Sequence, residues 1–310
     1  MLFPVGEGIY KQMSISKYPS KLSLPQTNPG ITTVLDYLII KFPDINPKVW
    51  QQRMLDGNVH WHDGSLINPD SSFQAQQRVY YYREVENESL IPFEEEIIFH
   101  DENILVAHKP NFLAVTPGGK YIKECLQNRL RNKTGIENLQ ALHRLDRVTA
   151  GLVLFSINPE TRHLYHQLFE TRKILKTYQA IAKVNIKENL MGKKWVVQNR
   201  IIKSTPSFIM KIIDGEANSH SEIHCQQQSN DKALFELKPI TGKTHQLRLH
   251  MESLGHPILN DKYYPTLEPE TADDFSKPLQ LLAKELQFID PVTQKTRIFD
   301  CNKNLKLDTI

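Results

Sequence analysis

The spacing of apolar residues predicts two short helices and a hairpin near the N-terminus. Apolar residues at 34, 35, 38 and 39 have helical spacing and follow a threonine that can cap a helix. A second helix is expected to begin at Asn46-Pro47, a cap with proline at the first helical position, and to end at Gly57. Asp63-Gly64 is a hairpin turn signal before the strand-like sequence RVYYY. These signals predict a small domain over residues 31–84, an extended arm over 1–30 and a polar linker over 85–93.

The pattern changes near residue 94, where strand-like segments begin to outnumber helical ones. KTYQAIAKV at 176–184 has period-2 alternation, and residues 151–155 form the continuous apolar run of a buried strand. One helix is expected between Thr244 and Gly255. Hairpin-like neighbours predominate, and the regular alternation of strand and helix of a doubly wound fold is missing. We therefore predict an α+β domain over residues 94–310, with a mixed, mostly antiparallel sheet flanked by helices.

Composition indicates a globular protein of a reducing compartment. Hydrophobic residues make up 40% of the chain, and no apolar run approaches the ~18 residues that cross a bilayer. The first residues lack the charged, apolar and small-residue regions of a signal peptide. The three cysteines are far apart and match no metal or disulfide spacing. We expect a cytoplasmic monomer with no membrane partner.

Basic residues are concentrated in the middle of the chain. The net charge is only +3, but residues 172–211 contain ten Lys or Arg and a single acid, Glu188. Residues 120–147 contain seven basic and three acidic residues. Such clustering is typical of a protein that binds a polyanion, most commonly nucleic acid. A solvated, lysine-rich surface explains the charge equally well at this point.

Several common functional motifs are incomplete. TGKT at 241–244 resembles the end of a phosphate-binding loop, but leucine occupies position 237, where that motif requires glycine. No G-x-G-x-x-G follows a strand, and no G-x-S-x-G is present. Two histidine pairs, at 60/62 and 245/250, lack acids or cysteines at ligand spacing and are expected to be ordinary histidines. These stretches therefore give no sign of a metal site.

The sequence HRLDR at 143–147 places Asp146 between Arg144 and Arg147, directly before the apolar strand. An arginine within ~4–6 Å of an aspartate keeps the carboxylate ionised. A charged carboxylate at the end of a core strand can act as a nucleophile or stabilise positive charge at carbon. A loop ion pair that only anchors the strand is the alternative, and this motif alone favours it.

Two further stretches offer binding chemistry. Tyr178 lies on the same face of its predicted strand as two alanines, which leaves room for a planar ligand beside the ring. Lys243 and Arg248 flank the predicted start of the helix after Thr244, where anions bind well. A core tyrosine and a helix with two solvated cations are the alternatives.

Four stretches, in this order, resemble the RluA-type pseudouridine synthases. They are ENILVAHKPNFLAVTPGG at 102–119, HRLDR with its strand, KTY at 176–178 and TGKTHQLRLHMESLGHPIL at 241–259. The resemblance covers residues 94–300 and makes this the catalytic domain. Each motif is weak alone, but four with family-like spacing are specific, so they favour the functional interpretations over the structural alternatives.

The resemblance implies that the chain converts uridine to pseudouridine in ribosomal or transfer RNA, without metal or cofactor. Asp146 would act at the ribose–base junction, as a nucleophile or through an eliminated sugar intermediate. Tyr178 would stack on the uracil, and Arg248 would pair with Asp146 and keep it charged. Arg144 would help extrude the uridine from the RNA stack. The implied RNA-binding residues are Arg144, Arg147, Lys176, Lys243 and His245, and for Arg147 a structural contact is the alternative.

Residues 31–84 resemble a small RNA-binding domain first known from a ribosomal small-subunit protein. They carry five basic and six acidic residues, so their contact with phosphates is expected to be weak. The catalytic domain also departs from the family pattern at four places, which indicates an outlying subfamily. These are Val148, Ala150, Asn111-Phe112 and Asn260-Asp261.

Two other function classes are considered. A non-catalytic RNA-binding protein with this fold would bind without modification, but the set of Asp146, Tyr178 and Arg248 is intact. A glycosidase acting on nucleosides needs a second carboxylate close to the first, and no acid near Asp146 in sequence supplies it.

Overall fold

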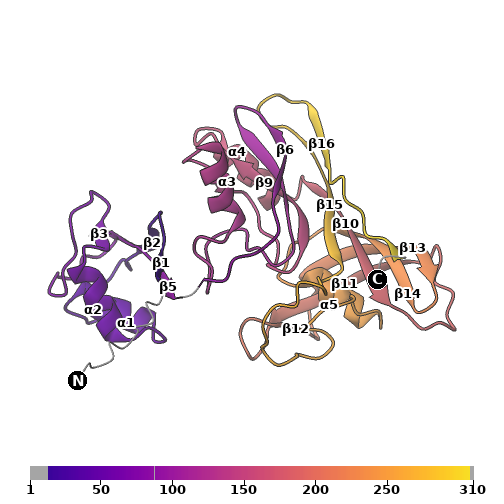
Figure 1. Ribbon diagram of the computed structural model, residues 1–310, viewed down its shortest axis with the longest axis horizontal. Coiled ribbons are helices and arrows are strands. Elements are labelled where there is room, and N and C mark those ends of the chain that lie inside the picture. Colours follow the sequence, from indigo (N-terminus) through magenta and orange to yellow (C-terminus); the bar gives the residue numbers. More distant parts are fainter. Residues whose placement is uncertain (1–12, 87, 308–310) are drawn as a thin grey trace, which may run out of the picture. The chain divides into compact units, whose positions relative to one another are not determined.

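The computed structural model describes residues 13–86 and 88–307, and the chain divides into two compact units (Figure 1). The first unit comprises the residues up to Ser89 together with Gly118–Lys123. The second comprises Leu90–Pro117 and the residues from Glu124 onward. Within the described part of the chain, no helix is both long and apolar enough to span a membrane.

The first unit contains two helices and a three-stranded antiparallel sheet. The helices are α1 (Val34–Lys41) and α2 (Pro47–Leu55), and the strand order is β2 (Ser20–Ser23), β4 (Arg78–Tyr81), β3 (Val59–Trp61). A capping box starts α1, because Thr33 and Asp36 each accept a hydrogen bond from the other's backbone N–H. Asn46 caps α2 as predicted, and the fully buried Trp50 belongs to the core that the helices share with the sheet.

Two short stretches of the predicted arm form strands that pair with other strands of the unit. Strand β1 (Met13–Ile15) pairs with β5 (Glu84–Glu86), and β2 pairs with β4. The predicted linker at 85–93 therefore begins inside a strand. Strands of three or four residues are too short to show an alternating pattern, which is why the sequence did not reveal them. Residues 1–12 lie outside the described part of the chain.

An 11-stranded sheet forms the framework of the second unit. Its order is β12-β11-β13-β14-β10-β15-β9-β7-β6, with β16 beside β15 and β8 beside β9. Every pairing is antiparallel except that of β15 with β9, so the predicted α+β fold with a mixed, mostly antiparallel sheet is confirmed. The strands are β6 (Glu96–His100), β7 (Ile104–Lys109), β8 (Gln140–Ala141), β9 (Ala150–Ser156), β10 (Leu175–Lys183), β11 (Lys194–Lys203), β12 (Met210–Ile213), β13 (Ser219–Ser229), β14 (Lys232–Pro239), β15 (Leu281–Ile289) and β16 (Thr296–Asp300).

Three helices accompany this sheet, namely α3 (Leu126–Thr134), α4 (Arg162–Glu170) and α5 (Gln246–Ser253). Leu168 of α4 packs in a core cluster with residues of β7, β9 and β15. Leu247 of α5 packs in a second cluster with residues of β10, β13 and β14. Both leucines also line one cavity, so this cavity lies where the two halves of the core meet.

Gly151 is paired with a neighbouring strand on each side of β9. It pairs with Lys109 of β7 on one side and with Ala283 of β15 on the other, and its φ of +120° is accessible to glycine but strained for other residues. A Cβ atom placed on Gly151 would lie 2.3 Å from the carbonyl oxygen of Ala283. The glycine after HRLDR is therefore required for the close approach of β9 and β15, at the strand end that follows Asp146.

Candidate active site

Asp146 lies in the loop between β8 and β9, and its side chain is 22% exposed. Its carbonyl accepts a hydrogen bond of 3.0 Å from the amide of Thr149, which closes a turn. Lys109, fully buried at the end of β7, donates through Nζ to the carbonyls of Pro110, Leu113 and Arg147 at 2.8, 2.7 and 3.0 Å. Three acceptors match the three N–H groups of an ammonium, so Lys109 holds the Asp146 loop against β7.

A second contact holds the loop in place. The Asn111 amide donates to the carbonyl of Val148 at 2.6 Å and to that of Leu279 at 3.2 Å. It thereby joins the loop to the segment that leads into β15. Asn111 is one of the departures from the family pattern, and these two bonds give it a structural explanation.

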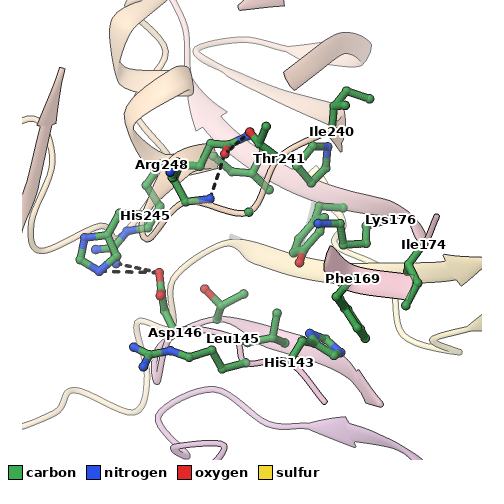
Figure 2. Close-up of a pocket in the computed structure, with 18 of the residues that line it drawn as sticks. His143, Leu145, Asp146, Phe169, Ile174, Lys176, Ile240, Thr241, His245 and Arg248 are labelled. Carbon is green, nitrogen blue, oxygen red and sulfur yellow. Dashed lines mark hydrogen bonds and ion pairs between the residues drawn. The ribbon is translucent and has the colours of Figure 1, made fainter. Parts of the chain in front are cut away.

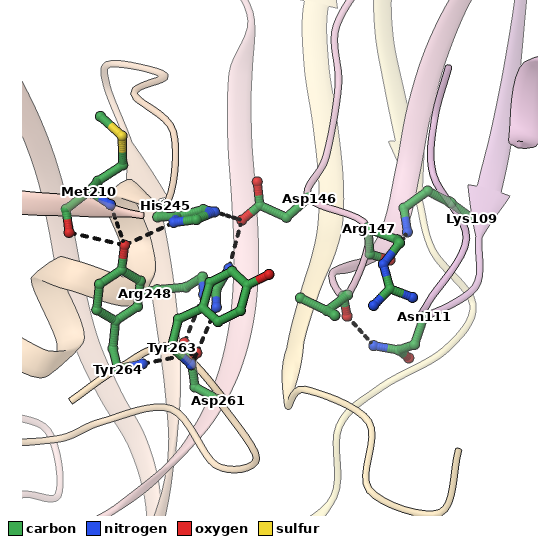
Figure 3. Close-up of polar contacts among 11 residues, drawn as sticks. Lys109, Asn111, Asp146, Arg147, Met210, His245, Arg248, Asp261, Tyr263 and Tyr264 are labelled. Carbon is green, nitrogen blue, oxygen red and sulfur yellow. Dashed lines mark hydrogen bonds and ion pairs between the residues drawn. The ribbon is translucent and has the colours of Figure 1, made fainter. Parts of the chain in front are cut away.

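Arg248 of α5 links Asp146 to a second carboxylate. Its Nη1 lies 3.3 Å from Oδ2 of Asp146, while Nε and Nη2 donate to the two carboxylate oxygens of Asp261 at 2.7 and 2.6 Å (Figure 3). The side chains of Arg248 and Asp261 are only 3% and 1% exposed. A bidentate pair of this kind fixes the plane of the guanidinium and aims its remaining edge at Asp146. The expected pairing of Arg248 with Asp146 is present.

The surroundings keep Arg248 charged. Burial opposes the charged form, but hydrogen bonds and charge from Asp261, together with Asp146, raise the pKa of the guanidinium above its ordinary value. The guanidinium also lies over the rings of Tyr263 and Tyr264, at 4.8 and 5.3 Å from their centroids. A fixed positive charge therefore lies 3.3 Å from the carboxylate of Asp146.

His245 also approaches the carboxylate. Its Nε2 lies 3.8 Å from Oδ2 of Asp146, and its Nδ1 lies 2.8 Å from the hydroxyl of Tyr264. Burial lowers the pKa of the imidazole despite the opposing charge of Asp146, so the ring is neutral near pH 7. Its backbone is left-handed, with φ of +55°, and it precedes α5 in place of the predicted cap, Thr244. His245 thus lies beside Asp146, whereas the sequence suggested a contact with RNA, which stays a prediction.

A cavity of about 600 Å³ opens beside Asp146. Tyr178 of β10 lines it together with Asp146, His245 and Arg248, and Figure 2 shows Asp146 and His245 at one end and Phe169 and Ile174 at the other. Burial, with the nearby charge of Asp146, raises the pKa of the Tyr178 phenol, so the hydroxyl keeps its proton at neutral pH. This volume is typical of a pocket for a molecule of nucleotide size.

Three of the predicted RNA-binding cations also line the cavity. Arg144 and Lys243 are exposed there, while Lys176 is half-buried. Burial lowers the pKa of the Lys176 ammonium. Cations at the entrance of a cavity that ends in a carboxylate suit a substrate that carries phosphate groups.

Arg147 is directed elsewhere. Its Nη1 and Nη2 pair with the two carboxylate oxygens of Asp273 at 2.6 and 2.8 Å, and Nη1 also donates to the carbonyl of Phe112 at 3.2 Å. It does not line the cavity that contains Asp146. The pairing is that of a structural contact, and a contact of Arg147 with RNA stays a prediction. The two arginines around Asp146 therefore differ in their surroundings.

Sequence reasoning missed Asp261, Tyr263 and Tyr264. They lie beyond the helix, in a loop whose turn forms when the amides of Tyr263 and Tyr264 donate to Oδ1 of Asp261 at 2.8 and 3.3 Å. The sequence DKYY offered only the aspartate itself as a signal. Across residues 13–86 and 88–307, no group of three or more His, Cys, Asp or Glu could hold a metal ion.

Comparison with known proteins agrees with this geometry. The family model for RNA pseudouridylate synthase matches residues 103–253, which include Asp146, Tyr178 and Arg248. The dual-specificity RNA pseudouridine synthase RluA of Haemophilus influenzae is 31% identical over 210 residues, which are 67% of this chain and 93% of that protein. An RNA pseudouridine synthase of Aquifex aeolicus is 25% identical over 282 residues, covering 85% of this chain and 88% of its own.

Solved structures show the same fold. Human RNA pseudouridylate synthase domain containing 1 aligns with a TM-score of 0.54 at 22% identity, covering 68% of this chain and 84% of that one. The human domain containing 4 protein aligns with a TM-score of 0.51 at 25% identity, over 66% and 87% of the two chains. The family motifs, the fold and the carboxylate held by an arginine inside a nucleotide-sized cavity agree with one another, and the chain therefore belongs to the RluA-type RNA pseudouridine synthases, which isomerise uridine in RNA.

Proposed function

We propose that the chain converts specific uridines of structured ribosomal or transfer RNA to pseudouridine, with Asp146 as the catalytic carboxylate. The observation that carries the proposal is the position of Asp146, which lines the cavity while Arg248 holds one of its oxygens at 3.3 Å. The RluA relative of Haemophilus influenzae is named as having dual specificity, and a mitochondrial relative of Saccharomyces cerevisiae as a tRNA pseudouridine(32) synthase. These names support RNA as the substrate and transfer RNA as one class of target.

The reaction needs a carboxylate at the ribose–base junction. In one route, Asp146 attacks C1′ as the bond to N1 breaks, and the electron pair leaves with the uracil. In the other, Asp146 takes a proton from the sugar and an unsaturated sugar intermediate forms. In both, the bond between C1′ and N1 breaks, the uracil turns and C5 bonds to C1′. In the first route this displaces Asp146 from C1′, and in the second Asp146 returns its proton to the sugar. C5 then loses its proton and N1 gains one. Arg248 stabilises the ionised carboxylate that either route requires.

Tyr178 would hold the uracil while it turns. Its ring lines the cavity beside Asp146, and its raised pKa keeps the hydroxyl protonated and able to exchange a proton with the base. Arg144, exposed at the same cavity, would enter the RNA stack when the uridine flips out, a step that costs a few kcal/mol.

Mapping of modified positions tests the proposal directly. The protein is incubated with unmodified cellular ribosomal and transfer RNA, and pseudouridines are mapped at nucleotide resolution. We expect new pseudouridine at one or a few discrete sites, as for an enzyme that modifies specific uridines. Tight RNA binding without any new pseudouridine would show a non-catalytic protein with this fold and would contradict the proposal.

Tyr178→Phe separates stacking from proton transfer. The ring remains, so we expect the KM for RNA to change less than about twofold. Loss of the hydroxyl is expected to lower kcat by about 10²-fold, the lower range for general acid–base catalysis. Steady-state kinetics on the mapped RNA measure both constants. A large rise in KM with unchanged kcat would show that the hydroxyl binds substrate instead.

Asp261→Asn tests the support of Arg248. The substitution removes a buried negative charge and places an amide against the guanidinium, so Arg248 should lose its fixed orientation toward Asp146. We expect kcat to fall by about tenfold or more and the protein to lose about 3 kcal/mol of unfolding free energy. Enzyme assays are done well below the midpoint of thermal unfolding.

Asp273→Asn is the matched control, because it breaks another bidentate arginine pair, that with Arg147. Its side chain is 19% exposed, so we expect a smaller loss of stability and a kcat within about threefold of the wild type. Equal losses of kcat in the two variants would show that Asp261 has no special connection to the site.

A further inference from the structure

The sheet of the first unit carries a row of stacked rings on its outer face. Tyr80 stacks with His60 at a centroid distance of 5.4 Å and an interplanar angle of 10°, and with His62 at 5.7 Å and 28°. Tyr82 continues the row, 5.9 Å from His60. His62 is exposed and the other three side chains are half-buried, so these rings are accessible to solvent although they contact one another.

The strand register explains why these rings share one face. His60 is paired with Tyr80, and Val59 and Val79, which alternate with them, are fully buried on the opposite face. Lys21 of β2 pairs with Tyr80 from the other side, so its side chain lies on the same outer face. Lys21 and Arg78 are both exposed. Two cations thus border a row of four rings.

The carboxylates close to this row are already engaged. Asp63 accepts hydrogen bonds from the amide and hydroxyl of Ser65 at 3.0 and 2.6 Å. Glu84 lies 3.6 Å from the guanidinium of Arg53, and both side chains are largely buried. The net acidity of this unit, which suggested weak RNA binding, is a sum over the whole unit, and the outer face of the sheet also carries the exposed cations Lys21 and Arg78.

We propose that this face, formed by Lys21, Arg78, Tyr80, Tyr82, His60 and His62, binds unpaired nucleotides of RNA. Every base has a π-face, so rings on a sheet bind bases by stacking with little sequence preference, while cations at the edge contact phosphates. The proposal rests on RNA as the substrate of the family, but not on the catalytic role of Asp146. In this proposal the first unit binds RNA through its bases as well as through its phosphates.

Binding of two short probes by the full-length chain tests the proposal. One probe is an unstructured 12-nucleotide RNA, and the other is a ribose-phosphate oligomer of the same length without bases. Tyr80→Leu keeps apolar bulk but removes the π-face, and we expect it to weaken binding of the RNA about tenfold, the effect of one lost stack. Binding of the base-free oligomer should stay within about twofold. Fluorescence anisotropy measures both affinities, and circular dichroism checks that the variant is folded.

Tyr80→Phe keeps the ring and should bind both probes as the wild type does. Ile40→Ala, at a residue 67% exposed on α1 of the same unit, should also leave both affinities unchanged. If Tyr80→Leu does not fold, His60→Ala removes the neighbouring ring and serves in its place. The proposal is overturned if Tyr80→Leu leaves RNA affinity unchanged, or if both probes lose affinity equally. These experiments measure binding without turnover. A protein that forms no pseudouridine can therefore be told apart from one whose first unit does not bind RNA bases.

Discussion

Asp146→Asn is expected to abolish pseudouridine formation while RNA binding survives. The amide has nearly the shape of the carboxylate, but it can neither attack C1′ nor remove a proton from the sugar. We expect the single-turnover rate on the mapped RNA to fall by about 10³-fold or more, and the Kd for the same RNA to change less than threefold. Removing the charge should not unfold the protein, because Asp261 still pairs with Arg248 through two hydrogen bonds of 2.6 and 2.7 Å.

The control for this substitution is Asp273→Asn, which makes the same chemical change outside the cavity. It should retain the single-turnover rate, because Asp273 contacts Arg147 and does not line the cavity. Full activity of Asp146→Asn would remove the carboxylate from the mechanism. Joint loss of activity and RNA binding would indicate instead that Asp146 organises the cavity rather than reacting.

The sequence predicted the residues that meet around Asp146 but not the residues that hold Arg248 in place. HRLDR, Tyr178 and Arg248 could be predicted because each belongs to a short motif. Asp261 could not, because it reaches Arg248 only after the loop beyond α5 turns back, and nothing local shows that turn. Arg144 and Arg147 look equivalent in sequence, yet Arg147 pairs with Asp273, 126 residues away. Side-chain direction at the start of a strand depends on such distant partners.

For the fold, too, local sequence patterns predicted some features and not others. Hairpin-like neighbours along the chain predicted a mostly antiparallel sheet, and the pairing of β6 with β7 is one such pair of neighbours. The parallel pairing of β15 with β9 joins residues more than a hundred positions apart, and no local pattern specifies it. Gly151 is the residue in the sequence that reflects this pairing. The reason for a glycine there becomes clear only from the structure, in which Ala283 of β15 leaves no room for a Cβ atom.

Gly151→Ala is therefore expected to destabilise the protein strongly. The added Cβ would lie 2.3, 2.5 and 2.7 Å from the carbonyl oxygen, amide nitrogen and Cα of Ala283, all of them backbone atoms that cannot rotate away. The φ of +120° adds strain that only glycine avoids. Together, overpacking and backbone strain should cost about 4 kcal/mol of unfolding free energy and lower the Tm by about 10 °C. Denaturant titration and thermal unfolding measure the two quantities.

Gly135→Ala separates the clash from the strain of a positive φ. Gly135 ends α3 with φ of +73°, but no atom lies within 4 Å of a Cβ built there. Only the left-handed conformation is then penalised, at about 1 kcal/mol. Because Gly151 starts the strand that follows the Asp146 loop, its substitution should also lower kcat at temperatures where the protein is folded, whereas Gly135→Ala should not. Equal stability losses in the two variants would show that β9 and β15 can separate without cost, and that the fixed position of Asp146 does not depend on their contact.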